Sequence, residues 1–63
     1  MITISKTENS FNDYILAELR GLSTDDKPTA IDELKIANGS TFIEIDTGKI
    51  YFYDLENELW KEV

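Results

Sequence analysis

The chain is short, acidic and free of cysteine and histidine, and each of these properties excludes a class of protein. Its 63 residues carry 6 Lys and Arg against 13 Asp and Glu, which gives a formal charge of −7. So short a chain buries too little surface for two cores, so we expect one domain over residues 1–63. The charge disfavours direct binding to nucleic acid or anionic membranes, and disulfides and Cys/His metal sites are excluded.

The N-terminal half, residues 1–22, predicts a short strand followed by an amphipathic helix. Residues 2–5 alternate in a way that favours a strand with Ile2 and Ile4 on one face. Ser10 and Asp13 have the spacing of a capping box, and apolar residues at helical spacing follow: Phe11, Tyr14, Ile15, Leu19 and Leu22. We therefore expect a helix over residues 11–20 that ends at Gly21 and packs on a sheet through Phe11, Ile15 and Leu19.

Residues 23–37 are expected to connect the two halves. Turn-forming residues surround Pro28, which indicates a loop over residues 23–29. Residues 30–37 fit either a helical turn or a strand, and a short helical or irregular segment is favoured. Asn38-Gly39 suits positive φ, so it fits both a helix exit and a hairpin turn.

The last part, residues 38–63, predicts a three-stranded antiparallel meander. Runs of β-branched and aromatic residues at 41–45, 50–53 and 59–63 are separated by a turn at Asp46-Thr47-Gly48-Lys49 and a polar break at 54–58. The predicted fold class is therefore α+β, with one amphipathic helix packed on a small antiparallel sheet and a short N-terminal strand.

Two registers compete for the first hairpin of this meander. A three-residue loop with Gly48 in the left-handed region pairs Ile45 with Lys49, so that Ile43, Ile45, Tyr51 and Tyr53 share a face. A two-residue Thr-Gly loop instead groups Ile43, Ile45, Ile50 and Phe52, but it requires positive φ at the β-branched Thr47. Steric cost favours the first register, which leaves Phe42, Ile50 and Phe52 facing outward.

No arrangement of residues typical of an enzyme is present, and we expect neither catalysis nor a cofactor. Without His or Cys, the usual acid–base and nucleophile pairs cannot form. Asp54, Glu56 and Glu58 lack the frame of a calcium loop, so they indicate a solvated acidic turn. Asp46-Thr47-Gly48 also occurs in aspartic proteases, but here it is typical of a hairpin.

Aromatic and apolar side chains in the meander are the candidate interface, because such residues dominate both small cores and binding sites. The candidates are Phe42, Ile50, Tyr51, Phe52, Tyr53 and Trp60. One helix can cover one face of the sheet, so the other face is expected to bind protein, through self-association or a larger assembly. Because the charge of −7 opposes close packing of copies, salt should strengthen self-association. No small-molecule substrate is expected.

Residues 38–54, with Trp60-Lys61-Glu62-Val63, resemble a recurring segment of phage and prophage structural proteins from Gram-positive hosts. The resemblance lies in a Gly-Ser strand, an Asp-Thr-Gly turn, an aromatic strand and a Trp strand. It implies a virion-associated or assembly accessory protein, found in the host cytoplasm during assembly and in the virion afterwards. No signal peptide is evident. The alternative is a small acidic phage inhibitor of a host nucleic-acid-binding or defence protein.

Overall fold

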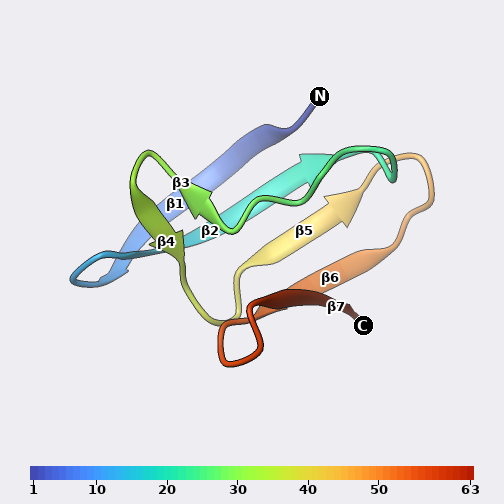
Figure 1. Ribbon diagram of the computed structural model, residues 1–63. Helices are drawn as coiled ribbons and strands as arrows, with labels where there is room; N and C mark the ends of the chain where they lie inside the picture. The colour runs from blue at the N-terminus through green and yellow to red at the C-terminus, as the bar shows by residue number, and fades with distance from the viewer.

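The computed structural model describes residues 1–63, apart from the side chains of Ser10 and Phe11, and shows an all-β protein. Among these residues there is no helix, so the predicted α+β fold is wrong. Seven strands form one mixed sheet (Figure 1). The strands are β1 (Thr3–Phe11), β2 (Tyr14–Gly21), β3 (Ala30–Ile31), β4 (Leu34–Ile36), β5 (Thr41–Glu44), β6 (Ile50–Asp54) and β7 (Leu59–Glu62).

Strand β2 is the centre of the sheet and pairs with three other strands. The order is β3-β4-β2-β5-β6-β7, and β1 pairs antiparallel with the other edge of β2. Strands β4 and β5 both run parallel to β2 along one edge. Strand β4 pairs at the start of β2, with Ile15 opposite Ile36, and β5 pairs at its end, with Leu19 opposite Phe42.

The helix predicted for residues 11–20 is instead the turn and second strand of the β1–β2 hairpin. Phe11 pairs with Tyr14 across Asn12-Asp13, and Asn12 has φ 29°. Asn and Asp favour such two-residue turns because they tolerate positive φ. Ile15, Ala17 and Leu19 alternate as the buried face of β2. The helical spacing misled because Tyr14, on the opposite face of β2, falls at helical spacing with the inward Ile15 and Leu19.

Residues 30–37, for which a helical turn was favoured, form the β3–β4 hairpin, so that prediction is also wrong. Ile31 pairs with Leu34 across Asp32 and Glu33, whose φ angles are 47° and 70°. Two successive positive φ angles match the twist of a tight hairpin. The predicted loop around Pro28 is confirmed, since residues 22–29 connect β2 to β3 without regular structure.

Between β4 and β5 the chain moves away from the edge of β2, which leaves a gap in the pairing along this edge. The side chain of Ser40 supplies hydrogen bonds in the gap. Asn38-Gly39 forms a turn here with Gly39 at φ 88°, so it is neither a helix exit nor a hairpin turn. The buried Ser40 Oγ accepts a hydrogen bond from Ala17 N at 3.1 Å and donates one to Ala37 O at 2.8 Å. The backbone N–H of Ala17 is therefore satisfied although neither β4 nor β5 pairs with Ala17 on this edge of β2.

The predicted meander is confirmed as β5-β6-β7, but its first hairpin has neither of the two expected registers. Ile43 pairs with Ile50 and Phe42 with Tyr51. The loop has four residues, because Glu44 N donates to Lys49 O and Gly48 N donates to Glu44 O. Gly48 has φ 74°, as expected. The longer loop lets Gly48 take the left-handed conformation without imposing it on Thr47.

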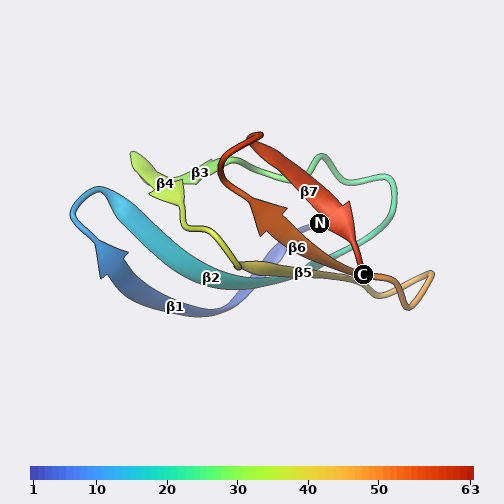
Figure 2. The ribbon, with the colours of Figure 1, turned by 90° about the horizontal axis from the view of Figure 1, so that it is seen from below.

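The sheet is strongly curled, and the core lies on its concave side. In Figure 2, β3, β4 and β7 lie above β1, β2 and β5, and β6 rises between them. Trp60 in β7 packs against the rings of Phe42 and Tyr53 and donates a hydrogen bond from Nε1 to Pro28 O at 2.9 Å. The buried apolar residues are Ile15, Ala17, Leu19, Ile36, Ala37, Phe42 and Tyr53.

Candidate functional site

The convex outer face of the sheet is built from side chains that point away from the core in three cross-strand rows. The first row is Thr3, Arg20, Ile43 and Ile50. The second row is Lys6, Glu18, Thr41, Phe52 and Lys61. The third row contains Glu8 with Leu16, and Asp54 with Leu59. We call these residues the outer face.

Apolar side chains collect on the β5–β7 part of the outer face. Ile50, Phe52 and Leu59 are 43%, 46% and 43% exposed, and Ile43 beside them is half-buried. Large exposed apolar groups that adjoin one another on a small protein typically mark an interaction site. This patch is the strongest candidate for a binding surface among the described residues.

The six residues predicted as an interface divide between the two sides of the sheet. Phe42 and Tyr53 are 0% and 3% exposed and belong to the core. Tyr51 and Trp60 are partly buried and pack against the same core. The outward orientation expected for Phe42 is therefore wrong, because the four-residue loop changes the register by one residue. Ile50 and Phe52 do face outward.

Sequence reasoning missed the contribution of β2 and of Leu59 to the outer face. Leu16 and Arg20 were assigned to a helix, so β2 was not expected in the sheet centre. Leu59 was placed in the third strand of the meander but not in the interface. The alternation of Leu59 and Lys61 about the inward Trp60 was the available signal.

The charges on the outer face balance, unlike those of the whole chain. The three rows carry three cations, Lys6, Arg20 and Lys61, and three anions, Glu8, Glu18 and Asp54, and Lys35 on β4 pairs with the outward Tyr14 beyond these rows. Lys61 Nζ lies 3.5 Å from Asp54 Oδ2, and Lys6 stands directly opposite Glu18. The net charge of −7 is therefore carried entirely by the rest of the molecule.

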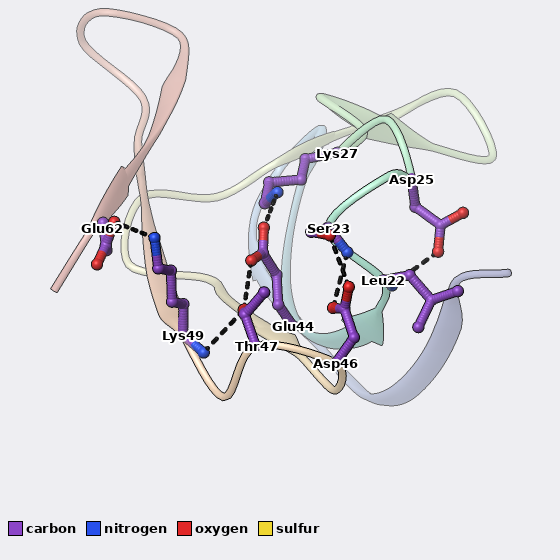
Figure 3. A network of polar contacts seen from close by, with 9 residues as sticks. All are labelled: Leu22, Ser23, Asp25, Lys27, Glu44, Asp46, Thr47, Lys49 and Glu62. Carbon is purple, nitrogen blue, oxygen red and sulfur yellow. Dashed lines mark hydrogen bonds and ion pairs between the residues drawn. The ribbon is translucent and has the colours of Figure 1, made fainter.

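On the concave side, a polar network ties the β2–β3 connection to the β5–β6 turn (Figure 3). Lys27 Nζ lies 2.7 Å from Glu44 Oε2, and both side chains are largely buried. The same ammonium lies 4.9 Å and 4.4 Å from the ring centroids of Phe42 and Tyr51, where the rings attract a cation. Thr47 Oγ1 donates to Glu44 Oε1 at 2.7 Å. Burial of Glu44 is thus compensated at both of its oxygens.

Hydrogen bonds in this network lower the pKa values of its carboxyl groups. The hydrogen bond from Lys27, followed by that from Thr47, lowers the pKa of Glu44. Ser23 donates to Asp46 from Oγ at 2.6 Å and from its backbone N at 2.9 Å, and these bonds lower the pKa of Asp46. Both groups stay ionised at neutral pH, so the network is complete there.

The acidic turn at 54–58 is held by local hydrogen bonds. Asn57 Nδ2 donates to Asp54 Oδ2 at 2.8 Å, and this bond is the main cause of a lowered pKa for Asp54. In the described part of the chain, no group of three or more acidic residues could hold a metal ion.

An open hollow of about 300 Å³ lies on the outer face and is lined by Lys6, Glu8, Leu16, Ala17, Glu18, Gly39 and Thr41.

Comparison with known proteins gave no match to any family model, curated protein or solved structure. Within the residues described, no helix is long and apolar enough to cross a membrane. The surface described above is therefore the basis for a functional proposal.

Proposed function

We propose that this domain is non-catalytic and acts by binding another protein through the outer face. The observation that carries the proposal is the group of neighbouring exposed residues Ile50, Phe52 and Leu59 on β6 and β7. Apolar and aromatic groups supply most of the binding energy when such a surface is covered. The charge balance of the face supports a protein partner, since no single sign of charge dominates it.

We further propose that its setting is phage or prophage assembly, as a structural accessory protein. This rests on the sequence resemblance of residues 38–54 and 60–63. Those residues make up β5, β6 and most of β7, the strands that carry the exposed apolar patch. On this proposal the protein acts in the host cytoplasm during assembly, with the virion as a further location.

A photo-crosslinking amino acid at position 52 tests the proposal in the cell that carries the gene. Phe52 is 46% exposed on the outer face, so the crosslinker should capture a defined protein. Position 4 is the matched control, because Ile4 is 48% exposed but pairs with Leu19 on the opposite face. Crosslinking to phage structural proteins from position 52 alone would support both parts of the proposal. Equal capture from both positions, or none from position 52, would reject the outer face as the binding surface.

A second candidate is the acidic inhibitor of a nucleic-acid-binding or defence protein, and the placement of charge favours it. The connections β2–β3, β3–β4 and β6–β7 lie on the concave side (Figure 2), and they contain Asp25, Asp26, Asp32, Glu33, Glu56 and Glu58. A basic partner would contact these turns. Crosslinking from Glu33 and Glu56, with none from Phe52, distinguishes this function from the first.

A further inference from the structure

We infer that the outer face is covered by a second copy of this chain, so that two sheets pack face to face. This inference rests on the proposed function, because it names the partner of the same surface. Three observations lead to it: the distribution of charge between the two sides of the sheet, the small core, and the size of the face.

The charge distribution removes the main obstacle to self-association. Two chains of charge −7 repel, but the outer face itself has three cations and three anions. Packing of outer faces directs the three acidic connections of each copy away from the partner (Figure 2). Each molecule is 15 Å thick along its shortest axis. The acidic sides then lie well beyond the Debye length of about 8 Å at physiological salt, so their repulsion is screened.

The small core indicates that the fold gains from a partner copy. Among the described side chains, seven apolar residues are buried, two of them alanines. Single domains of about this length gain little stability from one core and commonly depend on a disulfide, a metal or oligomerisation. The chain has no Cys, and the residues described contain no acidic metal cluster. Burial of Ile50, Phe52 and Leu59 in a dimer would add apolar area that the monomer leaves in water.

The size of the face matches what a stable dimer needs. The two longer dimensions of the molecule are 33 and 21 Å, so its broad face offers about 700 Å². Stable interfaces bury roughly 800 Å² per partner. A dimer formed this way would use nearly the whole outer face, with the apolar patch on β6 and β7 toward one side of the contact and Arg20 on the central strand β2.

Sedimentation velocity over a range of protein concentrations tests the inference. The wild-type chain should form a dimer, and Phe52→Glu and Ile50→Glu should each weaken dimerisation by about tenfold or more, since each places a charge in an apolar contact. Ile4→Glu is the control with the same change of charge and similar exposure on the opposite face, and it should change the dissociation constant by less than about twofold. Circular dichroism of dilute samples should show that all three variants keep the fold.

Salt dependence provides an independent measurement on the same samples. Because the acidic sides point apart, the dimer dissociation constant should change by less than about threefold between physiological and high salt. This differs from the strong salt effect that the whole-chain charge predicts. If salt lowers the dimer dissociation constant more than tenfold, the contact lies on the acidic side instead, and the inference is overturned.

The remaining outcomes separate this inference from the proposed function. Two results would show that a second copy does not cover the outer face. The first is a wild-type chain that stays monomeric at millimolar concentration, and the second is a dimer that persists in Phe52→Glu. If that monomer still crosslinks from position 52 to a different protein, the proposed function stands. If neither self-association nor crosslinking involves position 52, both are wrong.

Discussion

At the scale of single residues, the turns show how backbone geometry limits the choice of side chain. Positive φ occurs at Gly39 and Gly48 and also at four other residues. Those four are Asn12, Asp32, Glu33 and Glu58. Asn and Asp adopt this region at low cost, whereas Glu does so less readily. The preference of Asn for positive φ thus explains the β1–β2 turn, whereas the β3–β4 turn also requires positive φ at Glu33.

Gly48→Val should destabilise the protein by about 1–2 kcal/mol, because a β-branched residue is strained in the left-handed region. A Cβ at this position would meet no described atom within 4 Å, so the cost comes from the backbone alone. Urea unfolding measures the change in free energy. Gly48→Asn is the control and should cost much less, and equal losses in the two variants would contradict a backbone origin.

Ser40→Ala should cost about 1–3 kcal/mol, because it leaves the buried N–H of Ala17 without its acceptor, whereas Ala37 O keeps the hydrogen bond from Ser40 N. Hydrogen exchange at Ala17 should accelerate together with the loss of stability. Ser5→Ala removes a hydroxyl from an exposed edge position and should leave both quantities unchanged. Slow exchange at Ala17 in the Ser40 variant would show that another acceptor replaces the hydroxyl.

At the scale of elements, the sequence was informative where alternation was clean and misleading where both faces are apolar. Strands β5, β6 and β7 could be predicted because β-branched and aromatic residues alternate between clear turns. Strand β2 could not, because its outward Tyr14 falls on one helix-like stripe with the inward Ile15 and Leu19. Asn12-Asp13 signalled a hairpin, but Ser10 and Asp13 also match a helix cap. The parallel pairing of β2 with β4 and β5 had no local signal at all.

The same limit explains how much of the candidate site was predictable. The outward orientation of Ile50 and Phe52 was expected only with the favoured register and a helix on the other face, and neither of these is present. The burial of Phe42 depended on the length of one loop, and a change of one residue in register reverses the face of every side chain. Arg20, Glu18 and Leu16 reach the outer face only through β2, whose place in the sheet is set by long-range pairing.

Leu19→Ala should cost roughly 2–5 kcal/mol, because Leu19 is 1% exposed at the centre of β2 and its loss leaves a cavity beside Phe42. A domain with so small a core should then be largely unfolded at 37 °C. Thermal unfolding followed by Trp60 fluorescence measures this. Ile4→Ala on the exposed edge strand is the control, and similar losses in both variants would contradict the assigned core.

At the scale of the whole molecule, acid should destabilise the fold through its bound carboxylates. Hydrogen bonds lower the pKa values of Asp25, Glu44, Asp46 and Asp54. A lowered pKa in the folded state stabilises the fold above the usual carboxyl pKa of about 4, and this contribution is lost as pH falls through the lower folded value.

Urea midpoints should therefore be constant from neutral pH to about pH 5 and should fall steeply below pH 4. Glu44→Gln keeps the shape of the side chain but cannot titrate, so its midpoint should be lower at pH 7 and should depend less on pH in the acid range. Glu56→Gln in the exposed turn is the control. A wild-type midpoint that rises toward pH 3 would contradict the assigned network.

The parallel pairing of β2 with β5 also determines how quickly this chain can fold. Leu19 and Phe42 stand opposite each other although 23 residues separate them in sequence. Their contact requires closure of a long loop before much core is buried, and such non-local pairing slows folding compared with hairpins. Ser23 and Lys27 bind Asp46 and Glu44 across the ends of this loop. Docking of β5 on β2 is therefore the step expected to limit the folding rate, since the β5–β6 and β6–β7 hairpins need only short loops to close.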